Sequence, residues 1–183
     1  DTLSGNAVNS ATQYNIGGSR VLSAPGDNTI VGRNTGTAIV GNQNGNSFFG
    51  SAAGQINSGS QNSFFGRNAG IVNTGERNSF FGSAAGSGNT TGIDNSFTGY
   101  LAGGSNTTGD NNSFFGRLAG DTNATGSNNT IVGSNADVTS DNLSNATAIG
   151  ADAIVSQSNS LVLGSGVNVG IGTTAPNHRL TVG

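Results

Sequence analysis

A short pattern of polar and apolar positions recurs along most of the chain. The unit is an Asn, a Ser or Thr, two apolar residues and a Gly, as in NTIVG, NSFFG and NSFTG, with a looser TAIVG near the start. Most closing glycines follow one another after 16 or 17 residues. They are Gly32, Gly41, Gly50, Gly66, Gly82, Gly99, Gly116 and Gly133, followed by Gly150 and Gly164. Such a fixed period indicates a repeat architecture.

The rest of each unit is also periodic. A Gly, one or two variable residues and an Ala follow the first half, and an Asn with Ser, Thr or Ala and then Gly closes the unit. The alanines are Ala53, Ala69, Ala85, Ala102, Ala119, Ala136 and Ala153, and the closing asparagines are Asn57, Asn73, Asn89, Asn106 and Asn123. One repeat therefore predicts a strand, a tight turn, a second short strand and a turn.

This repeat predicts an all-β fold, a parallel β-solenoid or β-roll of two-strand coils. Frequent glycine excludes a helix as the repeating element, because each Gly costs about 1 kcal/mol in a helix interior. Strands of about four to five residues and a rise of about 4.8 Å per coil give a rod on the order of 45 Å long. Residues 28–166 form nine or ten coils, 1–27 an N-terminal cap or junction, and 167–183 a neck-like C-terminal segment.

Stacking explains the choice of asparagine and glycine. Equivalent positions of stacked coils lie above one another, so we expect an amide ladder along a corner. Its members are Asn46, Asn62, Asn78, Asn95, Asn112 and Asn129. Glycine suits corners that need a positive φ.

Two adjacent apolar ladders run through the first strand. One contains Ile30, Ile39, Phe48, Phe64, Phe80, Phe97, Phe114, Ile131, Ala148 and Val162, and the other contains Val31, Val40, Phe49, Phe65, Phe81, Thr98, Phe115, Val132, Ile149 and Leu163. Neighbouring strand residues point to opposite faces, so one ladder must face outward. An outward apolar stripe of this length predicts an interface, and we expect self-association as a homotrimer. The pattern does not decide which ladder lines the interior.

Composition narrows the partners. Only 32% of residues are hydrophobic, against roughly 45–50% in ordinary globular domains, so a thick core is not expected. The formal net charge is −3, lysine is absent and the six arginines are scattered, which argues against nucleic acid binding. No run of eighteen apolar residues predicts membrane insertion. Cysteine is absent, so there is no disulfide framework or thiolate metal site.

Catalytic and ligand-binding motifs are sparse. His178 is the only histidine, with no cysteine or serine constellation around it, and the acidic residues mostly occupy turns. The GGxGxD motif of calcium-binding β-rolls is absent, and the periodic GxxxxG matches lack the Lys of a phosphate-binding loop. We therefore expect no enzymatic activity, no cofactor and no metal site.

The coil NATAIGADAIVSQSNSLVLG at 145–164 resembles the head repeat of trimeric autotransporter adhesins of the YadA-like type. The longer NSFFGxxAGxxNTTG units look like the expanded form in large bacterial surface proteins and phage-like trimeric fibres. The resemblance implies a left-handed β-roll, a homotrimer and an extracellular, cell-surface or phage-like particle location. It extends over nearly everything after about Thr12. The units here are longer than the autotransporter repeat, which leaves the secretion route open.

The function expected from this resemblance is a structural and adhesive fibre segment that presents a rigid β-roll to a surface. Its receptor would be a host glycan or protein, and the candidate receptor-facing residues are Arg67, Arg77, Tyr100 and Arg117. An ice-binding solenoid, suggested by Thr74, Thr91, Thr108 and Thr125, is one alternative. A polysaccharide-processing tail spike is another, and it would need paired carboxylates roughly 5–10 Å apart.

Overall fold

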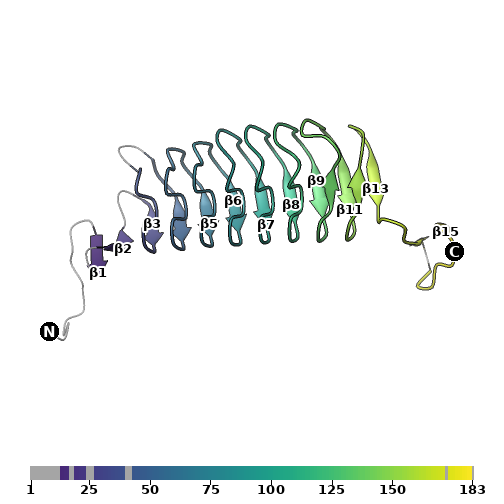
Figure 1. Ribbon diagram of the computed structural model, residues 1–183, viewed down its shortest axis with the longest axis horizontal. Helices are drawn as coiled ribbons and strands as arrows, with labels where there is room; N and C mark the ends of the chain where they lie inside the picture. Colours follow the sequence, from purple (N-terminus) through teal and green to yellow (C-terminus); the bar gives the residue numbers. More distant parts are fainter. Residues whose placement is uncertain (1–12, 17–18, 24–26, 40–42, 172, 183) are drawn as a thin grey trace.

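The chain forms a parallel β-solenoid, a rod of stacked coils (Figure 1). The computed structural model describes residues 13–16, 19–23, 27–39, 43–171 and 173–182. This part of the chain contains strands and turns and no helix, so it offers no helix that could cross a membrane.

One sheet runs the length of the rod. It has eleven strands, and from β3 onward neighbouring strands are parallel and in register. These parallel strands are β3 (Thr29–Val31), β4 (Ser47–Phe49), β5 (Ser63–Phe65), β6 (Ser79–Phe81), β7 (Ser96–Thr98), β8 (Ser113–Phe115), β9 (Thr130–Val132), β11 (Thr147–Ile149) and β13 (Leu161–Leu163). At about 4.8 Å per step, the solenoid makes about eight turns over roughly 38 Å.

The two ends of the rod differ. At the N-terminal end, β1 (Gln13–Ile16) and β2 (Ser19–Ser23) are antiparallel, and β2 pairs in turn with β3. At the C-terminal end, the sheet finishes at β13, and β14 (Val169–Ile171) and β15 (Leu180–Val182) form a separate parallel pair beyond the rod (Figure 1).

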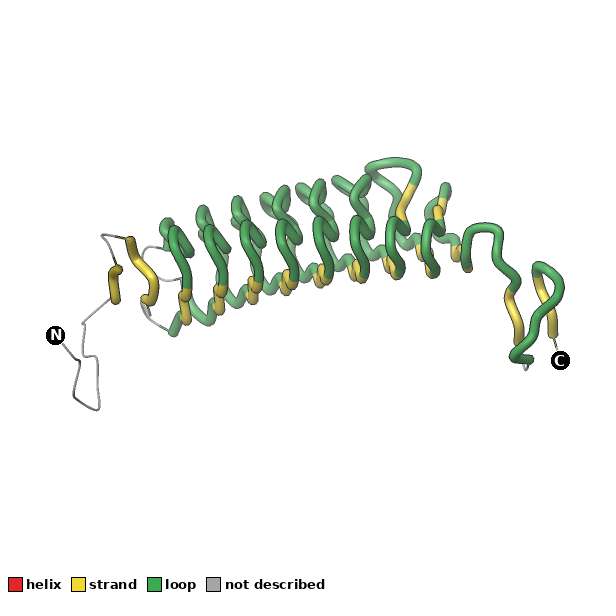
Figure 2. Tube along the Cα trace, turned by 60° about the horizontal axis from the view of Figure 1, so that its bottom comes forward, coloured by secondary structure: helices red, strands yellow, loops and turns green. Residues whose placement is uncertain are grey.

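Most described coils contain one strand of three residues, and the prediction of two longer strands per coil was wrong for them (Figure 2). A second strand forms only in two C-terminal coils, as β10 (Asp137–Val138) and β12 (Ile154–Val155), which pair in parallel. Elsewhere the corresponding backbone turns too often to stay extended. Ala84, for example, has φ 58 and Gly86 has φ +57, both in the left-handed region.

The TAIVG segment is not a coil of its own, as the sequence had suggested. Ile30 pairs directly with Phe48, so residues 32 to 47 complete one coil. Ile39 lies outside the sheet and packs, partly buried, against the core, while Val40 lies outside the described residues. The first apolar ladder therefore continues from Ile30 to Phe48 without Ile39.

The narrow interior is filled by the first apolar ladder and the alanines. Ile30, Phe48, Phe64, Phe80, Phe97, Phe114 and Ile131 are at most 1% exposed, and all seven periodic alanines are fully buried. Consecutive phenylalanine rings from Phe48 to Phe114 stack with centroids 4.8 to 4.9 Å apart and planes within 7°. The structure thus assigns this ladder to the interior, which the sequence pattern had left undecided.

Glycine is required where each ring meets the opposite wall. A Cβ on Gly86, which has φ +57, would lie 2.4 Å from Cε2 of Phe80. Gly54, Gly70, Gly103 and Gly120 face the ring of their own coil in the same way. The alanine and glycine columns leave the space into which the rings fit.

Two columns of buried asparagine hold the coils together. In the predicted column, the contact is to the backbone: Asn62 N–H donates to Oδ1 of Asn46 at 2.9 Å, and Asn78 N–H donates to Oδ1 of Asn62 at 2.8 Å. Direct amide-to-amide bonds instead join the closing asparagines Asn57, Asn73, Asn89, Asn106 and Asn123, with 2.6 to 3.1 Å between Nδ2 and Oδ1. The amide ladder therefore exists, but in the second column.

Candidate interaction surface

The outward face of the long sheet carries the second apolar ladder. Side chains alternate across each strand, so the residue after each buried Phe or Ile points away from the interior. This outer stripe consists of Val31, Phe49, Phe65, Phe81, Thr98, Phe115, Val132, Ile149 and Leu163. Phe81 is 42% exposed and Phe115 43%, whereas their neighbours Phe80 and Phe114 are fully buried. The stripe is thus the largest regular apolar feature described on this surface.

The outer stripe is ordered by stacking within the chain. Phe49 and Phe65 have ring centroids 4.7 Å apart, and Phe65 and Phe81 4.9 Å, with planes within 10°. Thr98 interrupts the stack before Phe115. Stacking fixes ring orientation along the rod but leaves one side of each ring open, so the stripe presents a rigid apolar surface.

Two residues before the outer stripe, the same face carries a parallel column of hydroxyl side chains. It consists of Thr29, Ser47, Ser63, Ser79, Ser96, Ser113, Thr130 and Thr147, and β13 places Leu161 there. Leu161 is 60% exposed, so the apolar surface widens at the C-terminal coil. The sheet face therefore has an apolar side and a hydroxyl side.

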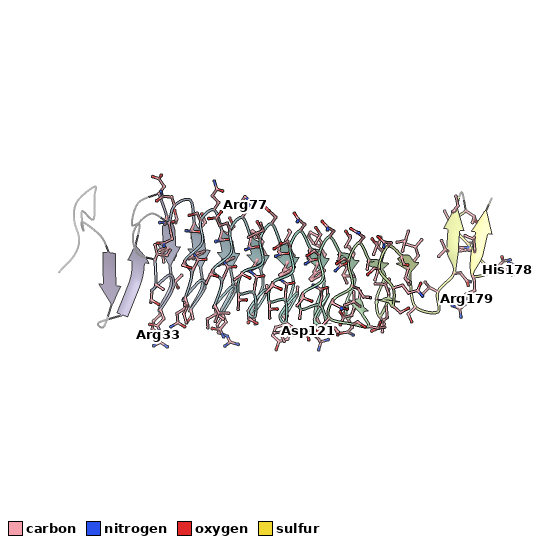
Figure 3. The ribbon with its side chains drawn as sticks, turned by 90° about the horizontal axis from the view of Figure 1, so that it is seen from above. Arg33, Arg77, Asp121, His178 and Arg179 are labelled. Carbon is pink, nitrogen blue, oxygen red and sulfur yellow. The ribbon has the colours of Figure 1, made fainter. Side chains whose placement is uncertain are left out.

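The four candidate receptor-facing residues do not form one patch. Arg67, Tyr100 and Arg117 occupy equivalent positions directly after a strand-closing Gly, where coil-to-coil hydrogen bonds such as Leu118 N–H to Tyr100 O stack them. Arg77 belongs to the opposite corner: Arg33, which shares the column of Arg67, and Arg77 lie on opposite long edges of the rod (Figure 3). A receptor could not contact all four through one flat surface.

Arg77 is already engaged within the chain. Its Nε donates to Oδ1 of Asp94 at 2.7 Å and its Nη2 to Oδ2 at 3.0 Å, while Nη1 lies 3.1 Å from Glu76 Oε2. The hydrogen bonds and charge of Arg77 lower the pKa of Asp94, and those of Asp94 raise the pKa of Arg77. The ion pair links adjacent coils and is exposed to solvent, so its contribution to stability is small.

An acidic pair on the rod was missed by the sequence analysis. Asp121 and Asp137 are 16 residues apart, the interval of one coil, and the charge of Asp121 contributes to raising the pKa of Asp137. Burial is the main cause of the raised pKa in both groups. Asp137 accepts hydrogen bonds from Thr122 N–H, Thr122 Oγ1–H (2.7 Å) and Val138 N–H. Its carboxylate is committed to holding two coils together.

The remaining candidates lie apart from one another. Thr91, Thr108 and Thr125 are exposed in turns and not on the flat sheet. His178 lies beyond the solenoid, with Nδ1 2.6 Å from Oδ1 of Asn177 (Figure 3). Within the described residues, no three His, Cys, Asp or Glu side chains are grouped as metal ligands would be.

A shallow polar hollow of about 290 Å³ lies near the N-terminal end of the solenoid. It is lined by Asp27, Asn44, Gly45, Ser60 and Gln61. Its lining offers hydrogen-bonding groups from two successive coils, since Gln61 N–H donates to Asn44 O. No family model, curated protein or solved structure matches this chain, so its function has to be inferred from these surfaces.

Proposed function

We propose that this chain is a non-enzymatic, structural and adhesive segment of a trimeric extracellular fibre. The observation that carries the proposal is the outer stripe, whose phenylalanines are rigidly stacked yet about 40% exposed. Soluble monomers rarely keep a long contiguous apolar patch in water. Burial of the stripe against other copies of the chain would remove it from solvent.

Three copies suit the shape of the stripe. It is one residue wide and runs along one side of the sheet face, with hydroxyl side chains on the other side. Three such columns meeting at a common axis each contact two others, whereas two columns would leave one flank of each ring in water. The parallel, evenly spaced coils allow all three chains to keep the same register along that axis.

Adhesion is the part of the proposal that rests on resemblance to trimeric adhesins and phage-like fibres. Fold alone does not imply function. The corner column with Arg67, Tyr100 and Arg117 faces away from the interior and supplies aromatic and cationic groups suited to a glycan or protein receptor.

The assembly is tested by light scattering coupled to size-exclusion chromatography. The expected mass is three times the 18.0 kDa of one chain. The double variant Phe65→Ser with Phe81→Ser should become monomeric with an unchanged far-UV circular dichroism spectrum. A matched control, Thr91→Ser with Thr108→Ser, changes two exposed turn residues and should remain trimeric. A monomeric wild-type chain at all concentrations would refute the assembly.

Adhesion is tested separately with immobilised glycans and host-cell surfaces. Replacing Tyr100 and Arg117 by Ser should reduce binding without changing the mass of the assembly. Binding that is unaffected by these changes, or absent for the trimer altogether, would refute the receptor role of this corner.

A polysaccharide-processing spike is the second candidate, and Asp121 with Asp137 is the observation that favours testing it. Release of reducing sugar that is lost in Asp137→Asn would support that activity. Unchanged polysaccharide after prolonged incubation would leave the fibre as the proposal.

A further inference from the structure

The structure divides the Asn-x-Ser/Thr sequences of this chain into two kinds. There are seven such sequences, and they begin at Asn89, Asn106, Asn111, Asn123, Asn128, Asn142 and Asn145. This motif is the acceptor sequence for N-linked glycosylation, provided that the asparagine lies on the surface. Exposure therefore separates acceptors from sequences that only share the composition of the repeat.

Three of the seven asparagines are closed to any enzyme in the folded chain. Asn89, Asn106 and Asn123 are fully buried. Nδ2 of Asn106 donates to Oδ1 of Asn89 at 2.6 Å and to the carbonyl of Gly109 at 3.0 Å, so both of its protons are in use. These residues belong to the amide ladder.

Three others form an exposed column on one corner of the rod. Asn111, Asn128 and Asn145 occupy the same position in successive coils, directly before the inward Asn or Ala at the start of a strand. Backbone hydrogen bonds such as Asn128 N–H to Asp110 O and Asn145 N–H to Ser127 O hold them in register. The hydroxyl residues of the three motifs, Ser113, Thr130 and Thr147, lie on the outward face of β8, β9 and β11.

The backbone at this corner does not require asparagine. Arg77 and Asp94 occupy the same column two coils and one coil before Asn111, with φ values of 56 and 57 against 57 for Asn111. The amide of Asn145 donates to Oδ1 of Asn159 at 3.0 Å. Among described residues no hydrogen-bond partner is found for the side-chain amides of Asn111 and Asn128, so packing does not account for these two amides.

We propose that Asn111, Asn128 and Asn145 are a column of N-glycosylation acceptors that take hexose from an activated, phosphate-linked sugar donor. In the transfer, Nδ2 forms a bond to the anomeric carbon of the sugar. The bond from that carbon to the phosphate oxygen of the donor breaks, and the phosphate leaves with the bonding electrons. Nδ2 gives up one proton to a base of the transferase.

The spacing of the column limits what it can carry. Adjacent acceptors are one coil apart, about 4.8 Å. Branched oligosaccharides on neighbouring coils would collide, so single hexoses or short linear chains are the substrates that fit. The column borders the hydroxyl side of the sheet face, about four residues or 13 Å along the strand from the outer stripe. Sugars here would leave that stripe free to associate.

The test is peptide mapping by mass spectrometry of the chain isolated from the cells that produce it. We expect hexose on at least one of Asn111, Asn128 and Asn145, and none on Asn89, Asn106 or Asn123. Replacing Ser113, Thr130 and Thr147 by Ala removes the acceptor motifs while keeping the asparagines, and should abolish the modification. An unmodified column, or sugar on a buried asparagine, would overturn the proposal.

A second measurement addresses access to the folded chain. The purified chain is incubated with an N-glycosyltransferase that recognises Asn-x-Ser/Thr and a nucleotide-activated hexose, either folded or after denaturation. In the folded chain only exposed motifs should react, while the denatured chain should also react at Asn106. Equal labelling of Asn106 and Asn128 in the folded chain would overturn the distinction. Asn135, exposed but without the motif, serves as the negative control.

Discussion

Adjacent residues of one strand should respond very differently to the same truncation. Phe80 is fully buried and stacks against Phe64 at 4.8 Å and Phe97 at 4.9 Å, whereas Phe81 is 42% exposed and stacks on Phe65 alone. The perturbations are Phe80→Ala and Phe81→Ala, two variants that remove the same atoms from opposite faces of β6.

The expected costs follow from burial. Phe80→Ala leaves an enclosed cavity between two rings and should lower the free energy of unfolding by about 3–5 kcal/mol. Phe81→Ala removes a ring that retains only part of its burial and leaves no closed cavity. In the dissociated chain its cost should be about 1–2 kcal/mol. The difference between the variants is therefore about 2–3 kcal/mol, which spans roughly two orders of magnitude in the folding equilibrium constant.

The assay is guanidinium unfolding in dilute solution, followed by far-UV circular dichroism. Hydrogen exchange with mass spectrometry would localise the loss, because each coil of a solenoid is stabilised mainly by its neighbours. At concentrations where copies associate, the cost of Phe81→Ala should rise and that of Phe80→Ala should not. Equal costs in the dissociated chain would refute the assignment of the first ladder to the interior.

Three further variants test the other structural elements. Gly86→Ala should cost more than 3 kcal/mol, since the added Cβ meets the Phe80 ring at 2.4 Å, while Gly45→Ala, with φ +71 but its nearest neighbour at 3.5 Å, should show only the strain of about 1 kcal/mol; similar denaturation midpoints would contradict this. Asn106→Ala should cost about 3 kcal/mol by orphaning buried partners, and a loss below about 1 kcal/mol in the same assay would argue against the amide ladder. Burial raises the folded-state pKa of Asp137, so its stabilising contribution is complete below the ordinary value of 3.8 and is lost as pH rises through the raised value. Asp137→Asn should flatten this fall in thermal stability with pH, and an unchanged pH profile would count against the assignment.

The sequence predicted the solenoid because its period is written in residue types that only stacking explains. Phe64, Phe80 and Gly66 recur at a constant interval, and the structure pairs their strands in parallel register. Strand number was predicted less well. The second half of each coil has Ala and Gly at the expected spacing, but left-handed φ values at residues such as Ala84 and Leu101 turn the backbone out of the extended region. Alanine and leucine give no warning of that conformation.

The candidate surface shows a similar division. Parity established that one of Phe80 and Phe81 must face outward, but both are the same residue type, so only the packing decides which. The Asp121 and Asp137 pair could have been found, because 16 residues is one coil. The separation of Arg77 from Arg67 required the corners to be located. Each error came from reading a position without its place around the coil.

The turn after each closing asparagine absorbs differences in coil length. Nδ2 of Asn73 reaches the carbonyl of Gly75, two residues on, whereas Nδ2 of Asn89 reaches Gly92, three residues on, and the strands on either side stay in register. An inserted residue there moves neither the rings nor the asparagines. Whole units can consequently be duplicated or deleted in the gene, even between copies of unequal length, without a frame to restore in the protein. Copy number then sets how far the chain reaches, and reach becomes a trait that recombination can change in a single step.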